Sequence, residues 1–436
     1  MKNVGHFCVN SMWKILDRSI IFVLAFTLIA FGFPGQSVGI CALTDKIIFS
    51  TELSRDIFSV IYACATMTGC FLVLFSGKLI DRFGLWRSTS FILVVWTLLL
   101  ILVGRGDSFY AAIFSHFCTK KFYFVIFLYL SLSLLRFLGQ NMLPVVGRMH
   151  IVVNFDKKSG LVMSFIGAFV SLLTGLAPRV MHFLSGNDTW YMVYERLAMA
   201  SVILTVGYMS FVIIHKKCFS RKVVIKSSNN DVLDISNERV LTRKELMKKS
   251  IFWCIMFPLC LNSFIGSGTT VHIVDIFRSA GESGKIAINS YLYLSAVTVI
   301  ASFMFGNLAD KGRIKESMII MLFCQFFGLI GLEHANKLCG FLAYVVCIGA
   351  SWGGYAIFMA VAWIKFFSKA NLGLVFGVAQ FLSSVVGSLG VILMSRSKTM
   401  FESYFVLFHA IEFIIIGAIC FVVCRMKTDL HSAKNF

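Results

Sequence analysis

Twelve stretches of the chain are each apolar enough to cross a lipid bilayer. A spanning helix needs roughly 20 mostly apolar residues, and ten stretches of about this length contain no Asp, Glu, Lys or Arg. They are Ser19–Thr44, Ile57–Gly77, Ser88–Gly104, Ser159–Pro178, Leu197–His215, Ser250–Val274, Ile286–Ala309, Ser317–Leu332, Leu338–Ile364 and Ala370–Ser395. Two more hold one charge each: Phe122–Gly147 contains Arg136, and Ser403–Cys424 contains Glu412. Helices are expected, because backbone polar groups in lipid must be satisfied within their own segment, and a barrel would instead show alternating segments of about ten residues.

The composition supports a membrane rather than water as the solvent. Hydrophobic residues make up 58% of the 436 positions and charged residues only 14%, whereas about a quarter of a soluble domain is charged. The first apolar run is long enough to span, and Pro34-Gly35 is followed by Gln36 rather than by a small-residue cleavage site. We therefore interpret this run as the first helix and not as a cleaved signal.

The formal charge of +19 does not indicate a nucleic-acid partner, because the basic residues follow the membrane topology. With the N-terminus placed in the cytoplasm, about 27 of the 40 Lys and Arg residues fall on that side. This asymmetry predicts an integral, multi-pass protein of the cell (inner or plasma) membrane with both termini cytoplasmic.

The longest polar stretch divides the predicted helices six and six. Residues 216–249 are too polar to fold alone and are expected to form a cytoplasmic linker between an N-terminal six-helix bundle, 1–215, and a C-terminal one, 250–436. Near the end of the linker, Thr242 and Glu245 have capping-box spacing. They predict a short helix that leads through Ser250 and Trp253 into the seventh span.

A repeated motif relates the two halves. After the second span the chain reads G-K-L-I-D-R-F-G-L-W-R over Gly77–Arg87, and after the eighth it reads G-N-L-A-D-K-G-R-I-K over Gly306–Lys315. Both fit G-x-L-x-D-[RK] followed by basic residues, and both lie between the second and third span of their half. Duplicated halves that rock about a central site are an architecture of secondary transporters.

With these paired motifs, and with R-F-L-G-Q at Arg136–Gln140 in the fourth span, the sequence resembles the major facilitator superfamily. The resemblance implies an all-α membrane protein with 12 transmembrane helices in two pseudo-symmetric six-helix bundles. It also implies alternating access, with helices 1, 4, 7 and 10 lining a central cavity. No ATP-binding phosphate loop is present, so ATP-driven pumping is not supported.

A finer resemblance points to one branch of this superfamily. The motif G-Q-S-V-G at Gly35–Gly39, together with Arg136–Gln140 and Thr242–Trp253, is similar to the branch of oxalate–formate antiporters and monocarboxylate carriers. That branch implies small organic anions. Helices 8 and 11 lack the internal Lys or Arg that oxalate-type members use, which argues against a dicarboxylate substrate.

The paired motifs are expected to form gates at the cytoplasmic face. A carboxylate there can hold the gate closed by charge-assisted hydrogen bonds to basic groups or to a helix N-terminus, and the glycines allow close helix approach. The alternative is that these are solvated loop charges. The gating candidates are Gly77, Asp81, Arg82, Arg87, Gly306, Asp310 and Arg313.

Arg136 is the strongest candidate for substrate contact. A charge at the bilayer centre costs at least about 2.5 kcal/mol, so Arg136 should face the bundle interior, where it would bind a carboxylate, join a coupling network or pair with helix carbonyls. The other substrate-binding candidates are polar or aromatic residues of the cavity-lining helices, for which helix packing is an equal alternative. They are Gln36, Ser37, Gln140, Asn262, Ser263, Trp352 and Tyr355.

Two further titratable pairs lie outside this set. Glu412 has His409 one turn before it, and we favour a buried, hydrogen-bonded or neutral glutamate over a proton carrier at this position. His272 and Asp275, near the outer end of the seventh span, are expected at the surface, with an outer proton relay as the alternative.

The sequence thus predicts a secondary active transporter of a small polar metabolite, with a monocarboxylate or amino acid favoured and a proton as the coupling ion. No enzyme activity, cofactor, metal or nucleic acid is expected, and the protein should be a monomer in the lipid bilayer. The thirteen cysteines are interpreted as small core residues. The alternatives are a receptor or sensor that has lost transport, and a drug or metabolite efflux antiporter.

Overall fold

The computed structural model describes residues 18–114, 119–155, 159–186, 189–219, 241–367 and 371–432. Within them, 12 helices are long and apolar enough to cross a membrane. Each overlaps one of the twelve predicted stretches, so the predicted all-helical membrane fold is confirmed. Most of the predicted linker, 220–240, lies outside the described residues.

Contacts divide the chain into two compact units. Unit 1 comprises Met1–Leu53 and Cys64–Ser220, and unit 2 comprises Ser54–Ala63 and Arg221–Phe436. One segment departs from chain order. Residues Ser54–Ala63, which include the beginning of helix α4, group with the second half, whereas the rest of α4 belongs to the first half.

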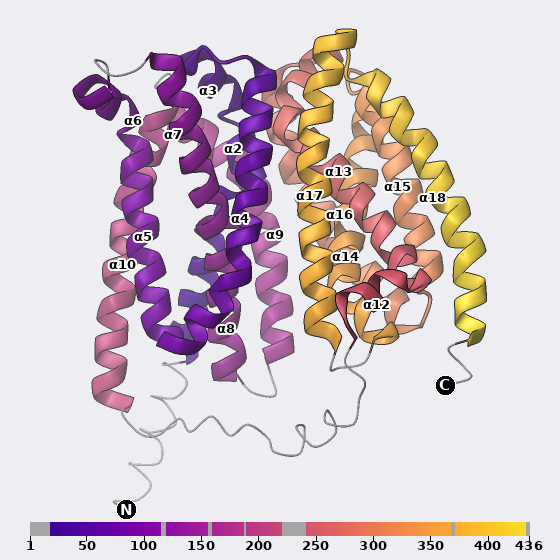
Figure 1. Cartoon of the computed structure of the whole chain (residues 1–436), viewed down its shortest axis with the longest axis horizontal. Helices are drawn as coiled ribbons and strands as arrows, with labels where there is room; N and C mark the ends of the chain where they lie inside the picture. Colours follow the sequence, from indigo (N-terminus) through magenta and orange to yellow (C-terminus); the bar gives the residue numbers. More distant parts are fainter. Residues whose placement is uncertain are drawn as a thin grey trace, which may run out of the picture. The chain divides into compact units, whose positions relative to one another are not determined.

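Unit 1 begins with the helix over residues 18–30. Its other α-helices are α2 (Ser37–Cys41), α3 (Thr44–Thr51), α4 (Arg55–Phe83), α5 (Leu85–Gly104), α6 (Gly106–Phe109), α7 (Lys120–Leu135), α8 (Leu143–Phe155), α9 (Ser159–Ser185) and α10 (Trp190–Phe219). Helix α5 packs along α10 (Figure 1). Between them, Thr97 Oγ1 lies 2.7 Å from Ser201 Oγ and 3.0 Å from Thr205 Oγ1, so polar side chains join the two helices.

Unit 2 contains six long helices and one short one. They are α12 (Arg243–Lys248), α13 (Ser250–Ser279), α14 (Gly284–Asp310), α15 (Ile314–Glu333), α16 (Leu338–Phe366), α17 (Leu372–Phe401) and α18 (Phe405–Ser432). Helix α14 packs along α16, α13 along α17, and α15 along both α16 and α18 (Figure 1).

The first span is broken where the sequence places Pro34-Gly35. A single 3-10 turn, η1 (Phe33–Gly35), ends there, and Gln36 is extended at φ −90° and ψ 158° before α2 begins. Proline removes a backbone donor and disfavours a continuous helix. The break leaves Gln36 and Ser37 at the start of a new short helix.

The predicted helix after the linker is present. Helix α12 has Thr242 as its N-cap and Glu245 at its third position, and both reciprocal capping-box hydrogen bonds are made. The Trp253 indole donates to the Met247 carbonyl at 2.8 Å, which joins α12 to the beginning of α13. The prediction from the spacing of Thr242 and Glu245 is therefore confirmed.

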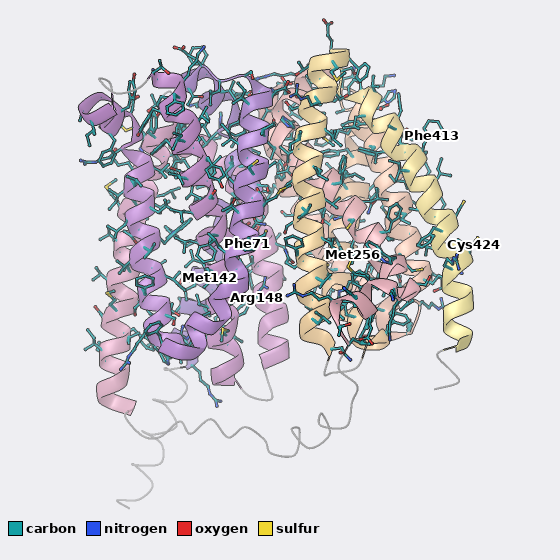
Figure 2. All side chains as sticks on the ribbon, viewed as in Figure 1. Phe71, Met142, Arg148, Met256, Phe413 and Cys424 are labelled. Carbon is teal, nitrogen blue, oxygen red and sulfur yellow. The ribbon has the colours of Figure 1, made fainter. Side chains whose placement is uncertain are left out.

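The distribution of apolar side chains suits a lipid environment. Met142 and Met256 are fully buried in their units, whereas Phe413 on α18 points away from its unit and is 76% exposed (Figure 2). Many other large apolar residues are exposed on the helices. Such a surface would be unstable in water, but lipid tails are as apolar as these side chains.

Candidate functional site

Arg136 lies at the centre of the polar contacts of unit 1. It is 3% exposed, and it begins a π-helical segment, η3 (Arg136–Met142), between α7 and α8. Its Nε donates to Thr66 Oγ1 at 3.0 Å, and its Nη1 donates to Ser37 Oγ at 3.0 Å. The guanidinium therefore connects the broken first span, α4 and the fourth span, and π-helical segments of this kind often occur at functional sites.

The backbones of the first and fourth spans are in close contact beside Arg136. A Cβ on Gly139 would lie 2.8 Å from the Gly32 carbonyl oxygen and 2.7 Å from the Trp96 ring, and a Cβ on Gly35 would overlap the Leu135 carbonyl oxygen. Glycines permit this approach because they have no side chain. The contact brings together the two motifs, Gly35–Gly39 and Arg136–Gln140, that the sequence singled out separately.

Two polar residues of the fourth span and α4, Gln140 and Thr66, differ in how far the sequence predicted them. Gln140 is partly buried, and its Oε1 is shielded from solvent and accepts no hydrogen bond from the part of the chain that the structure describes. A buried carbonyl oxygen of this kind is costly unless a donor reaches it. Thr66 was not predicted, because a threonine in an apolar helix usually bonds only to its own backbone.

The candidates of unit 2 fall into two separate groups. Asn262 is 5% exposed, and its Oδ1 accepts hydrogen bonds from Ser351 and, at 3.4 Å, from Gln325, so it joins α13 to α15 and α16. Ser263 Oγ instead donates to Tyr355 OH at 3.3 Å, and both side chains are partly accessible. Asn262 thus fits the helix-packing role, and Ser263 with Tyr355 remains a candidate for substrate contact.

Trp352 lies one turn before Tyr355 on α16. A Cβ on Gly266 of α13 would lie 3.3 Å from its Nε1, and its ring is 6.1 Å from that of Tyr291. Gly266 therefore leaves room for the indole beside the Ser263–Tyr355 pair.

The gating candidates are described only in part. Gly77, Asp81 and Arg82 lie within α4, but their side chains are outside the described part of the structure. Arg87 is exposed near the start of α5 and, with Phe83, Ser88 and Phe91, lines a cavity of about 430 Å³.

In the second motif, Asp310 is the exposed last residue of α14, and the exposed Arg313 is the N-cap of α15. Gly306 is half-buried, and a Cβ placed on it would make only one contact, at 3.9 Å from Ile357. These positions are compatible with a gate at this end of unit 2.

A polar cluster at the start of α4 was not anticipated. Arg55 Nη2 lies 3.7 Å from Asp275 Oδ1, and Asp275 Oδ2 also accepts a 2.6 Å hydrogen bond from Tyr404. One residue further on, Asp56 accepts from Ser395 at 2.6 Å and pairs with Arg396 at 3.4 Å. These contacts hold Ser54–Ala63 to the ends of α13 and α17 within unit 2. We refer to these six residues as the α4-start cluster.

The expected surface position of His272 is wrong. His272 is 0% exposed, and its Nε2 lies 3.1 Å from the Val391 carbonyl oxygen and 3.4 Å from Ser59 Oγ. The sequence placed it near a helix end, but the beginning of α4 and helix α17 cover that side of α13. Asp275, one turn later, is 21% exposed, which is closer to the surface position expected for it.

Replacing Asp275 with Asn will loosen the beginning of α4. The substitution keeps the size of the side chain but removes the charge that pairs with Arg55, and a partly buried pair of this kind contributes about 1 kcal/mol. Amide hydrogen exchange of residues 54–63 should therefore become about 5-fold faster. A matched control is Glu195→Gln, which removes the exposed ion pair with Arg105 (3.6 Å) in unit 1. Equal amide exchange rates over residues 54–63 in Asp275→Asn and in the native chain would show that the Arg55–Asp275 ion pair does not hold the beginning of α4.

The twelve candidate membrane-spanning helices of the described residues, with an arginine buried among them, are the features of a multi-pass membrane protein. The sequence matches the Major Facilitator Superfamily over residues 15–391, and the chain belongs to that family. A search of curated proteins found no significant sequence match.

Solved structures of transporters have the same fold. A bacterial homologue of the human lysosomal transporter Spinster, in an inward-facing and unoccupied conformation, is 13% identical with a TM-score of 0.60, over 88% of this chain and 83% of that one. The nucleoside transporter NupG is 12% identical with a TM-score of 0.61, over 92% and 99%. A D-xylose–proton symporter is 15% identical with a TM-score of 0.61, over 94% and 97%. At these identities the likeness shows the fold alone.

Proposed function

We propose that this chain is a secondary active transporter of a small polar metabolite that carries one carboxylate, either a monocarboxylate or an amino acid. The observation that carries the proposal is the position of Arg136, which is 3% exposed in a π-helical segment and donates to two hydroxyls. A guanidinium binds a carboxylate through paired, charge-assisted hydrogen bonds, so a buried arginine within a span suits a substrate that carries one carboxylate.

The neighbours of Arg136 suit the rest of such a substrate. Gln140 Oε1 is a buried acceptor that a substrate ammonium or hydroxyl group would satisfy. Gln36 lies at the break in the first span, one residue before Ser37. Within unit 2, the Ser263–Tyr355 hydroxyl pair and the Trp352 indole are separate candidates for substrate contact.

Proton coupling is the second part of the proposal. The solved neighbours include a symporter that couples D-xylose to protons, and the α4-start cluster contains two carboxylates, Asp56 and Asp275, held by hydroxyl and guanidinium groups. Loss of these contacts would release the beginning of α4, which is grouped with unit 2, whereas the rest of α4 belongs to unit 1.

The proposed transport cycle also uses the paired motifs. With both termini in the cytoplasm, Asp81 and Asp310 would hold the cytoplasmic gates, and the monomer would alternate between two accessible states. The substrate must bind both states with similar affinity, because a large difference would trap the carrier in one of them.

Uptake into proteoliposomes tests the proposal. Purified protein, reconstituted with both orientations present, is offered labelled monocarboxylates, neutral amino acids and nucleosides, with and without a proton gradient. We expect uptake of one carboxylate-bearing class, driven by an inward proton gradient and lost when a protonophore collapses it. Uptake of nucleosides alone would refute the carboxylate assignment. No uptake of any class by folded protein would refute secondary transport of these metabolites and favour a receptor, and uptake driven only by an opposed gradient would indicate an efflux antiporter.

A further inference from the structure

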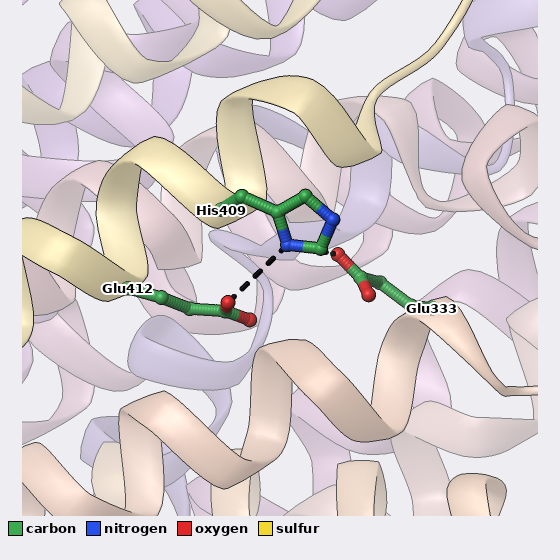
Figure 3. Close-up of side chains that lie close together, drawn as sticks. All are labelled: Glu333, His409 and Glu412. Carbon is green, nitrogen blue, oxygen red and sulfur yellow. Dashed lines mark hydrogen bonds and ion pairs between the residues drawn. The ribbon is translucent and has the colours of Figure 1, made fainter.

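Three side chains from α15 and α18 converge at one end of unit 2. Glu333 is the last residue of α15, and His409 and Glu412 lie on the first two turns of α18. His409 Nδ1 lies 3.4 Å from Glu333 Oε1 and 3.3 Å from Glu412 Oε2, with the imidazole between the two carboxylates (Figure 3). One ligand atom from each residue lies within 4.8 Å of the other two.

The two carboxylates are largely removed from solvent. The Glu333 side chain is 10% exposed and that of Glu412 is 13% exposed, whereas His409 is 58% exposed. The Oε1 atoms of both glutamates are shielded from solvent. That of Glu333 makes the 3.4 Å ion-pair contact with His409 Nδ1 but no hydrogen bond, and that of Glu412 accepts no hydrogen bond from the described residues. Each such oxygen needs a donor or a cation, because an unsatisfied buried polar group is costly.

A divalent cation would balance the charge of this cluster. Two ionised carboxylates beside a neutral imidazole carry a combined charge of −2. Burial of uncompensated charge is strongly unfavourable. A divalent cation would neutralise both carboxylates and leave His409 neutral, as a metal ligand must be.

The distances also suit a tetrahedral metal. Zinc bonds of about 2.1 Å to nitrogen and oxygen place neighbouring ligand atoms of a tetrahedron about 3.4 Å apart. The two distances from His409 Nδ1 to the glutamate oxygens, 3.3 and 3.4 Å, agree with that edge. Calcium and magnesium prefer six or more oxygen ligands, so an imidazole with two carboxylates favours a first-row transition metal.

We propose that Glu333, His409 and Glu412 form a binding site for a divalent transition metal, with Zn²⁺ as the best fit. His409 Nδ1 and one oxygen from each glutamate are the protein ligands, and water on the exposed side of His409 completes the coordination. The ion joins the end of α15 to the beginning of α18. This site is separate from Arg136 and its neighbours, so it does not depend on the transport proposal.

Direct metal binding tests the site. The full chain is purified with a histidine-free tag, treated with a chelator and titrated with Zn²⁺ by calorimetry, and with Co²⁺ by visible absorption. We expect one equivalent to bind, intense d–d bands of a tetrahedral Co²⁺ site, and a rise in unfolding temperature that depends on the Zn²⁺ concentration. Glu333→Gln, Glu412→Gln and His409→Ala should each weaken binding by about 100-fold or more.

A neighbouring histidine provides the control. His334 follows Glu333 directly, is exposed, and lies outside the three-residue cluster, so His334→Ala should bind metal as the native chain does. The two glutamine variants keep the shape of the side chain, and their metal-free unfolding temperature shows whether they fold. Absence of stoichiometric binding to the native chain would overturn the proposal. Binding that persists at native affinity in folded Glu333→Gln and Glu412→Gln would overturn it equally.

Discussion

Replacing Arg136 with Ala will abolish accumulation of the anionic substrate while the protein remains folded. The guanidinium is buried and is fixed through Nε and Nη1 by Thr66 and Ser37. Removing one partner of a buried, charge-assisted pair costs about 2–5 kcal/mol, so uptake should fall by about 100-fold or more. The measurement is initial uptake into proteoliposomes, with thermal unfolding of the same preparation.

Two further variants separate charge from geometry. Arg136→Lys keeps the positive charge but loses the planar fork, so it should restore only part of the uptake. Ser37→Ala removes one hydrogen bond that orients the guanidinium and should raise the half-saturating substrate concentration, with a smaller effect on the maximal rate. Native uptake by folded Arg136→Ala would assign Arg136 a structural role only, and the carboxylate proposal would fail with it.

Replacing Gly35 with Ala will prevent normal folding of unit 1, although it adds a single methyl group. The new Cβ would overlap the Leu135 carbonyl oxygen and lie 3.1 Å from Gly139 Cα. Both are backbone atoms, which no side-chain rotation can move away. Since overpacking in a core costs about 1–3 kcal/mol and occasionally more, we expect a loss near or above the top of that range. The measurements are the yield of monodisperse protein and its unfolding temperature.

Gly167 on α9 is the matched control for this prediction. A Cβ placed there meets no atom within 4 Å, and Ala is a better helix former than Gly by about 1 kcal/mol. Gly167→Ala should therefore leave stability unchanged or slightly higher. If Gly35→Ala and Gly167→Ala unfold at the same temperature, the stability of unit 1 does not depend on the close approach of Gly35 to the fourth span.

Two local signals predicted the positions of individual residues. Arg136 is buried, as expected for a charge in an apolar span, and the capping box before α13 is present because its signal lies within four residues. Thr66 and Glu333 were missed because a threonine in a span and a glutamate at a helix end are both ordinary. Their importance comes only from the partners that lie across from them, Arg136 and His409.

The order of the twelve spans of the described residues, their helical form and their approximate lengths follow from the sequence alone. These features depend on local rules: lipid forces each span to satisfy its own backbone, and the bilayer thickness sets its length. The tertiary structure alone decided which faces of the helices meet. It brought Ser37 to Arg136, placed the beginning of α4 against α13 and α17, and buried His272, because the rotation of each helix is set by packing against its neighbours, which hydropathy does not encode.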